Sequence, residues 1–199
     1  SACLAALKNI SGLGFERFTS WFVIKNSIIE NGNEAALGGG IYIKNSNVII
    51  DSSIIRGNEA ETSVSQNLEG HGGGIFVFNS DVEISNSQIN LNQATLQENK
   101  GGALYFEGDG SGNIIKISDT DIRGNIAKTA SAIYAKSINV VLDRVTISGN
   151  HFNGNIGAAV YVEMTPMMIL NSVITGNSYN PSINTGAGAI YFEDNIGIS

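Results

Sequence analysis

Apolar residues in this chain lie two positions apart in short stretches that recur along its length. The recurring pairs are Val48/Ile50, Val82/Ile84, Ile115/Ile117, Val140/Leu142 and Met167/Ile169. A further isoleucine follows five residues after each pair, at 55, 89, 122, 147 and 174. A period of two is typical of a strand with one buried face, and no stretch sustains the period of a helix. The pattern therefore predicts short strands separated by tight turns.

A motif of small residues, which ends in an aliphatic and an aromatic residue, divides the chain into repeats. Its six copies cover 38–42, 72–76, 101–105, 130–134, 157–161 and 187–191, and their aliphatic residues are 27 to 34 positions apart. This period, with three strand-like pieces per copy, predicts an all-β solenoid. We expect a right-handed, single-stranded parallel β-helix of about six coils with three short strands each. Residues 1–20 would form a partial coil or a lead-in segment, and residues 21–199 a β-helix that continues beyond both ends.

An asparagine stands three residues after the last isoleucine of each repeat. These residues are Asn58, Asn92, Asn125, Asn150 and Asn177, and the first, partial copy offers Asn31 or Asn33, one residue out of step. Asparagine tolerates left-handed backbone and caps turns with its own amide. Amides stacked in successive coils also hydrogen-bond to one another. We therefore predict a structural asparagine ladder rather than a catalytic group.

One aromatic residue per repeat lies between two positions that the alternation assigns to the core. These residues are Tyr42, Phe76, Tyr105, Tyr134, Tyr161 and Tyr191. If they face outward, they form a stripe along the rod that can stack on sugar faces or bind a partner. Stacking of the rings on one another, which stabilises the sheet without any ligand, is the favoured interpretation, and a docking role is the alternative.

The charge of the chain narrows the range of partners. Its formal net charge is −7 and its pI is about 4.7. Nucleic acids and anionic membranes bind clustered Lys and Arg, so neither partner is expected. No apolar stretch approaches the length of a membrane-spanning helix. Cys3 is the only cysteine, which excludes a disulfide framework and a structural zinc site.

The loops that follow the asparagines differ most in length between repeats. Four glutamates lie in them, at 59, 61, 69 and 98. We expect no cofactor and no metal site, with weak Ca²⁺ binding at this acidic edge as the alternative. His71 and His151 lie in the same loops and are expected to be solvated.

The best local match to a catalytic pair is Asp119-x-Asp121, with Arg144 in the place of Asp119 one coil later. On a strand, residues two apart point the same way about 6.5–7 Å from each other. That separation is near the lower limit for an inverting glycosidase. Arg123 and Arg144 would neutralise both acids, so we expect no enzyme. The alternative is a carbohydrate-active enzyme in which Asp119 and Asp121 act as acid and base and Arg144 assists.

The repeat resembles that of polymorphic outer-membrane proteins, a family of bacterial surface proteins marked by Gly-Gly-Ala-Ile and Phe-x-x-Asn tetrapeptides. The first tetrapeptide reads Gly38–Ile41, Gly72–Ile75 and Gly101–Leu104, and loosens to Gly157–Val160. The second has isoleucine in place of phenylalanine, as in Ile55-x-x-Asn58. The resemblance covers about residues 21–194. The chain is also similar to the wider pectin-lyase-like superfamily, whose β-helices include polysaccharide lyases and hydrolases.

The resemblance implies a non-enzymatic structural or adhesive segment of a larger secreted or cell-surface protein. Such a segment acts as a spacer, an adhesion element or an assembly element. Open coil ends expose unpaired strand edges, so we expect other parts of the same long chain or neighbouring subunits to cap them. Glycans are a further expected partner. A carbohydrate-active enzyme or a glycan-binding module is the alternative.

Overall fold

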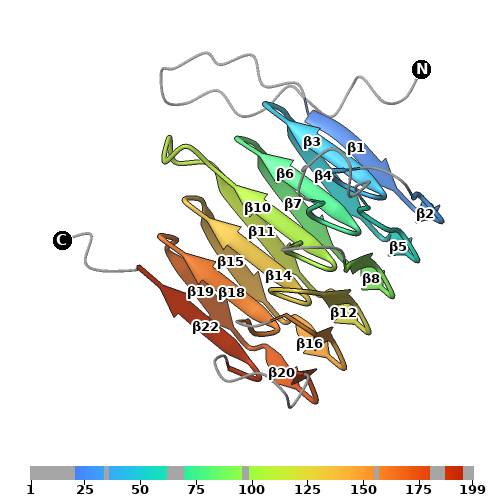
Figure 1. Ribbon diagram of the computed structural model, residues 1–199. Coiled ribbons are helices and arrows are strands. Elements are labelled where there is room, and N and C mark those ends of the chain that lie inside the picture. The colour runs from blue at the N-terminus through green and yellow to red at the C-terminus, as the bar shows by residue number, and fades with distance from the viewer. Residues whose placement is uncertain are drawn as a thin grey trace, which may run out of the picture.

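The strands of this chain stack in parallel to form a β-solenoid, and Figure 1 shows its coils following one another along a single axis. The computed structural model describes residues 21–33, 36–61, 70–95, 99–154, 157–179 and 187–194. Within these ranges the protein is all-β, without a helix, and makes about five turns. The predicted parallel solenoid is confirmed, and the number of turns is close to the number of coils expected.

Three sheets of six strands form the walls of the solenoid. The first contains β1 (Trp21–Lys25), β4 (Asn47–Asp51), β7 (Asp81–Ser85), β11 (Ile114–Ser118), β15 (Asn139–Asp143) and β19 (Met167–Leu170). The second contains β3 (Ile41–Lys44), β6 (Ile75–Phe78), β10 (Leu104–Glu107), β14 (Ile133–Lys136), β18 (Val160–Glu163) and β22 (Ile190–Glu193). The third contains β2 (Ile28–Glu30), β5 (Ile54–Arg56), β8 (Gln88–Asn90), β12 (Asp121–Arg123), β16 (Thr146–Ser148) and β20 (Val173–Thr175).

A fourth sheet was not predicted from the sequence. It consists of two-residue strands that follow the asparagine corner: β9 (Gln93–Ala94), β13 (Ile126–Ala127), β17 (His151–Phe152) and β21 (Ser178–Tyr179). Two residues are too few to show the alternation of apolar and polar side chains, so the sequence pattern does not predict these strands. Ala94 and Ala127 of this sheet are fully buried and pack with Ala60 of an earlier coil. The repeating unit therefore has up to four strands rather than three.

The core consists of the residues that the alternation assigned to the inside. Equivalent positions lie in register, so that Ile122 is paired with Ile89 on one side and Ile147 on the other. All three isoleucines are fully buried. Since each coil places similar aliphatic side chains above those of the last, one continuous hydrophobic core runs along the axis. The predicted core positions are confirmed.

At the corner that leads to the asparagine, one residue of each coil adopts left-handed backbone. Just before the asparagine corner, this residue is Asn31, Gly57, Leu91, Gly124, Gly149 or Gly176, with φ between 56° and 63°. Glycine occupies four of these six places because it adopts positive φ without a steric penalty. Leu91 is the exception, and its side chain is 67% exposed. Its strained backbone is therefore not compensated by burial in the core.

We predict that Leu91→Gly stabilises the protein. Left-handed backbone costs a non-glycine residue about 1–2 kcal/mol, whereas glycine costs about 0.5–1 kcal/mol through the flexibility of the unfolded chain. The expected net gain in the free energy of unfolding is about 0.5–1 kcal/mol, measured by denaturant titration. Gly149→Ala is the matched control, because no atom lies within 4 Å of the added methyl group. It should lose about 1 kcal/mol. A loss of stability in Leu91→Gly would contradict this account of the corner.

Candidate functional site

The buried asparagines form a continuous ladder between the third and fourth sheets. The side-chain amide of Asn58 donates to the side-chain oxygen (Oδ1) of Asn92 at 2.9 Å. The backbone N–H of Asn58 donates to the same oxygen at 3.1 Å. The second amide hydrogen of Asn92 binds the backbone carbonyl of Ile55 at 3.0 Å. The same arrangement repeats at the remaining rungs. The predicted asparagine ladder is present, and it satisfies backbone groups that the corner removes from water.

The ladder ends at Gly32 in the first coil. Strand pairing places Asn31 opposite Gly57, and Gly32 is therefore opposite Asn58. Its backbone N–H donates to the Asn58 side chain at 3.0 Å. A β-carbon on Gly32 would lie 2.0 Å from the carbonyl oxygen of Gly39, so no side chain fits there. The expectation that Asn31 or Asn33 continues the ladder is wrong, because the strand register places Gly32, and neither asparagine, opposite Asn58.

The six aromatic residues of the second sheet form one unbroken stack, here called the aromatic column (Tyr42, Phe76, Tyr105, Tyr134, Tyr161 and Tyr191). Successive ring centroids are 4.9 to 5.4 Å apart. The rings lie outside the aliphatic core, in a cluster of their own. They stack because strands in register carry them one above another at about 4.8 Å per coil.

Stacking covers the faces of the interior rings. Phe76, Tyr105, Tyr134 and Tyr161 are only 1 to 6% exposed, whereas Tyr42 at the end of the column is 49% exposed. Sugars stack on an open aromatic face, and each interior ring has a neighbouring ring on both faces. The expected solvent-facing stripe is therefore corrected: four of its six rings are buried. Glycan binding by the stripe of Tyr105, Tyr134 and Tyr161 finds no support in this geometry.

Hydroxyl groups of the column bind a row of carboxylates at its edge. Tyr105 donates to Glu107 at 2.8 Å, and Tyr134 donates to Glu163 in the next coil. Burial, assisted by the hydrogen bond to Glu163, raises the pKa of Tyr134 well above its ordinary value. Burial also raises the pKa of Tyr161, with its hydrogen bond to Glu193 as the second cause.

Glu163 lies between a tyrosine and a lysine. Burial is the largest single influence and raises its pKa, but hydrogen bonds from Lys136 and Tyr134 and the charges of Lys136 and Lys100 together outweigh it, so the pKa of Glu163 lies below the ordinary value. Lys136 contacts this carboxylate at 2.7 Å, which raises the pKa of the lysine. The row beside the aromatic column thus contains a partly buried ion pair linked to a tyrosine hydroxyl.

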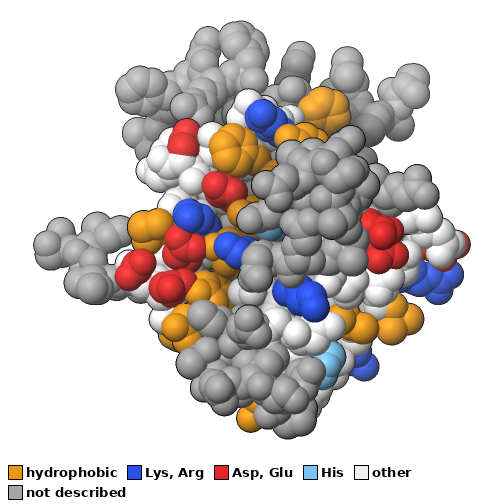
Figure 2. All heavy atoms as spheres, viewed as in Figure 1, with side chains coloured by type: hydrophobic (Ala, Val, Ile, Leu, Met, Phe, Trp, Pro, Cys, Tyr) orange, Lys and Arg blue, Asp and Glu red, His pale blue; other side chains and the backbone are white. Residues whose placement is uncertain are grey.

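A hollow of about 500 Å³ lies over the aromatic column between β3 and β14. Lys44, Lys100, Lys136 and Glu107 are the charged residues that line it. Figure 2 shows positive, negative and hydrophobic side chains next to one another on the face that Figure 1 shows in front. Three lysines and one glutamate leave this lining with a charge of +2, opposite in sign to the −7 of the whole chain. The hollow is therefore locally cationic and aromatic.

His71 belongs to this wall rather than to solvent. Its ring stacks on that of Tyr105 with a centroid distance of 4.5 Å. The residue as a whole is only 8% exposed. Its Nδ1 accepts a hydrogen bond from the backbone N–H of Lys100 at 3.2 Å. The expectation of a solvated His71 is therefore wrong, because its ring packs against Tyr105 of the column. His151 lies in β17, is half-buried, and contacts the hydroxyl of Ser178 at 3.0 Å.

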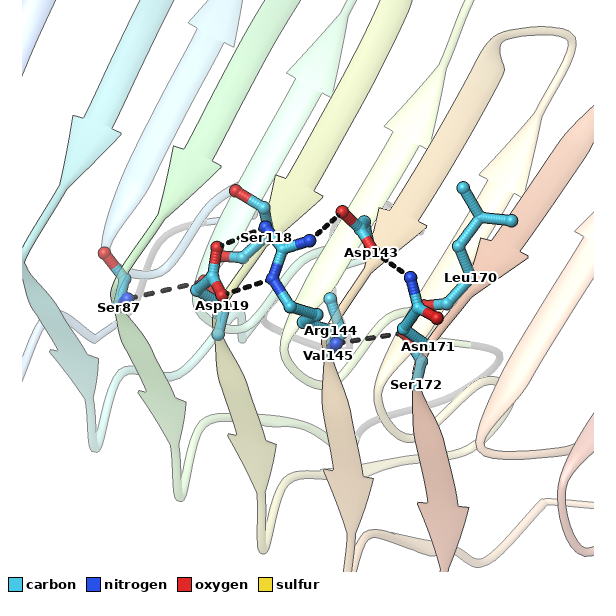
Figure 3. Close-up of polar contacts among 10 residues, drawn as sticks. Ser87, Ser118, Asp119, Asp143, Arg144, Val145, Leu170, Asn171 and Ser172 are labelled. Atoms are coloured by element: carbon cyan, nitrogen blue, oxygen red, sulfur yellow. Dashed lines mark hydrogen bonds and ion pairs between the residues drawn. The ribbon is translucent and has the colours of Figure 1, made fainter.

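Of the two candidate catalytic acids, Asp119 lies in the turn between the first and third sheets, where Arg144 holds it (Figure 3), whereas Asp121 lies in β12. Arg144 contacts the two carboxylate oxygens of Asp119 at 2.7 and 2.8 Å, and it also contacts Asp143. Asp121 is paired with Arg123 at 2.9 Å. The hydrogen bond from Arg144 lowers the pKa of Asp119. The predicted neutralisation of both acids by arginine is confirmed.

The strand geometry assumed for this pair is wrong. Asp119 is not on a strand: it occupies the turn before β12 with a φ of 48°, and Arg144 occupies the same place one coil later with a φ of 55°. Figure 3 shows the Asp119 side chain at this corner reaching toward Arg144 of the next coil. A carboxylate with a lowered pKa, held in an exposed ion pair, is poorly suited to act as a general acid. The enzyme alternative finds no support in these residues.

The expected acidic loop edge lies only partly within the described residues. Glu59 accepts a hydrogen bond from the side chain of Gln93 at 2.8 Å, whereas Glu69 and Glu98 lie outside the described ranges. Among the residues that are described, no three His, Cys, Asp or Glu side chains converge as a metal site would require. Nor does any helix long and apolar enough to cross a membrane occur in the described ranges.

Comparison of the chain with protein-family profiles, with curated proteins and with solved structures gives no significant match. Inference about its function therefore rests on the contacts and charges of its own residues.

We predict that Asn92→Ala strongly destabilises the protein. The change leaves the buried amide of Asn58 and the carbonyl of Ile55 without their partner. Each unsatisfied buried group costs about 1–3 kcal/mol, so the free energy of unfolding should fall by about 3 kcal/mol or more. Asn90→Ala serves as the control, because the Asn90 amide makes only an exposed hydrogen bond to Gln88. It should change stability by about 0.5 kcal/mol or less. Equal effects of the two substitutions would contradict the role of the ladder.

The raised tyrosine pKa values predict a loss of stability in alkaline solution. Unfolded tyrosine ionises near pH 10, whereas folded Tyr134 and Tyr161 keep their protons above that pH. The unfolded chain then binds fewer protons than the folded one, so the free energy of unfolding falls as pH rises above about 10. Tyrosinate absorbance and circular dichroism should change together in a pH titration. The double variant Tyr134→Phe/Tyr161→Phe should show a shallower fall, and full ionisation with intact structure would refute the assignment.

Proposed function

We propose that this chain is a non-enzymatic structural segment of a larger secreted or cell-surface protein. In this role it serves as a rigid spacer, an adhesion element or an assembly element. The observation that carries the proposal is that, among the residues that the structure describes, core-facing apolar side chains are exposed at both ends of the solenoid. Core-facing Phe22 in the first coil is 62% exposed, although Val48 beside it is 5% exposed. At the other end Phe192 is 59% exposed, although Val162 beside it is fully buried.

Open ends favour a unit that functions through its neighbours. Leaving a phenylalanine in water rather than burying it costs about 1.5–3 kcal/mol, and unpaired strand edges lie beside these side chains. Further coils of the same polypeptide, or neighbouring subunits, would cover these side chains and the strand edges beside them. The end coils are therefore the proposed docking faces.

Rigidity is the second property that supports the proposal. The aromatic column and the asparagine ladder both run through successive coils, so every coil is tied to the next by side chains as well as by backbone hydrogen bonds. Such a rod holds two attachment points at a fixed separation. The resemblance of its repeat to bacterial surface proteins supports an extracellular or cell-surface location. A glycan partner would have to use the ends of the column or the cationic hollow, because the interior rings are covered.

The parent polypeptide tests this proposal. Mass spectrometry of the native protein should find peptides with further Gly-Gly-x-Ile and Ile-x-x-Asn coils adjoining this chain. A membrane-impermeant amine reagent should label its exposed lysines on intact cells, with a cytoplasmic protein as the unlabelled control. A short parent without further coils, or one protected from the reagent until the cells are lysed, would overturn the proposal.

A further inference from the structure

The two ends of the solenoid match each other strand for strand. β1, β2 and β3 each lie at one end of a six-stranded sheet, and β19, β20 and β22 lie at the opposite ends of the same three sheets. A second copy placed one coil beyond the first would therefore extend all three sheets at once. Its β1 would follow β19, its β2 would follow β20, and its β3 would follow β22.

The side chains at the junction between β22 and β3 would repeat a pair that already exists inside the molecule. β10 has the sequence Leu-Tyr-Phe-Glu and lies in register with the Ile-Tyr-Ala-Lys of β14. β22 has the sequence Ile-Tyr-Phe-Glu, and β3 has Ile-Tyr-Ile-Lys. Three of the four residues of each end strand are thus identical to those of the corresponding internal strand. Pairing of β22 with β3 would therefore use the same kinds of side-chain contact that already join β10 and β14.

Each position of this junction has a physical partner. Tyr191 and Tyr42 would stack as Tyr105 and Tyr134 do at 4.9 Å. Tyr42 has room for a ring, since it is 49% exposed. The exposed Phe192 would enter the core beside the inward-facing Ile43, where the internal pair has Phe106 beside a smaller alanine.

Opposite charges meet at the last position. Glu193 of one copy would face Lys44 of the next. Glu193 already accepts a hydrogen bond from Tyr161, but Glu163 accepts one from Tyr134 and still pairs with Lys136 at 2.7 Å. Lys44 makes no ion pair within the described part of the chain, where it lies 5.6 Å from the ring centroid of Phe78. The charges therefore select the direction in which the ends join.

The other two sheets contribute apolar contacts to the same junction. Met167 and Ile169 of β19 are only partly buried, and the core-facing residues of β1 that would cover them are Phe22 and Ile24. In the third sheet, Val173 of β20 is 53% exposed and Ile28 of β2 is 57% exposed. A junction would cover Met167 and Ile169 in the core and place Val173 next to Ile28 on the outer face of the third sheet.

We propose that copies of this chain associate head to tail through the two end coils, so that β22 of one copy pairs in parallel with β3 of the next. The proposal rests on the docking role of the ends proposed above and names a second copy of this chain as the occupant. A contact between two different faces does not close on itself, so association continues into a linear filament. With six strands per sheet in each copy, the filament repeat is about 29 Å.

Sedimentation of the full chain over a range of concentrations tests the association. The mass should rise steadily with concentration, and more steeply in moderate salt, because the net charge of −7 repels at low ionic strength. Electron microscopy should show unbranched filaments with the repeat given above. A monomer at every concentration, as expected if residues 1–20 or 195–199 of the same chain cover the ends, would overturn the proposal. A closed dimer would overturn it as well.

Charge reversal identifies the junction. In Lys44→Glu two glutamates meet at each junction, and in Glu193→Lys two lysines meet, so each single variant should associate roughly 10-fold more weakly than the wild type. An equimolar mixture of the two variants restores opposite charges at every contact and should recover association. The double variant Lys44→Glu/Glu193→Lys should recover it alone. Lys116→Glu makes the same charge change on an inner coil, away from the ends, and should associate as the wild type does.

Failure of the mixture and of the double variant to recover association would overturn the assigned pairing even if the wild type forms oligomers. Single variants that associate like the wild type would overturn it too. Neither result affects the proposal of a surface rod, which depends on the parent polypeptide and its labelling. If instead the parent has no further coils but the chain forms filaments, the head-to-tail contact stands and the larger-protein proposal falls.

Discussion

Every coil of this solenoid must turn a corner without leaving backbone groups unsatisfied, and the rest of the structure depends on how it does so. At the buried corner the direction of the chain changes, so neighbouring strands no longer satisfy all the N–H and C=O groups. One asparagine per coil supplies the missing partners: its oxygen accepts from the coil before it, and its amide donates to a carbonyl of that coil and to the next asparagine. The residue before it takes left-handed backbone. The ladder therefore fixes the register of the coils, and the register in turn places like residues above like.

The register between coils explains why the fold was largely predictable from the sequence, whereas the contacts on the surface were not. Alternating apolar residues and a corner asparagine are local patterns, and both are visible in the sequence. Burial of the aromatic column depends on contacts between coils, such as the stacking of His71 on Tyr105, and no local pattern reports such a contact. The backbone of Asp119 was missed for a related reason. Glycine marks a left-handed turn clearly, but none of the residues that occupy this turn in successive coils is a glycine. They include Ser52, Asn86, Asp119, Arg144 and Asn171.

The same stacking that stabilises the aromatic column removes it as a set of open binding faces. An aromatic ring has one electron-rich face on each side, and in the interior of the column both are occupied by other rings. What remains accessible is the edge of the column, where lysines and glutamates pair with one another and with tyrosine hydroxyls. Recognition on this side of the rod would therefore be electrostatic rather than based on stacking. A chain that is acidic as a whole presents a cationic hollow there.

A periodic structure also makes its ends chemically equivalent to its interior. In an ordinary domain the surface differs in composition from the core, but the end coil of a solenoid exposes the same aliphatic and aromatic columns that its middle coils bury. Terminal repeats that function alone are usually polar on the outer side, which prevents further addition. The first and last described coils lack this polarity, since Phe22 and Phe192 occupy core positions there. Because the last strand of the second sheet ends in glutamate and the first ends in lysine, the two ends differ in charge while sharing the same apolar pattern. In the head-to-tail contact proposed above, apolar likeness would favour addition, and the difference in charge would give it a direction.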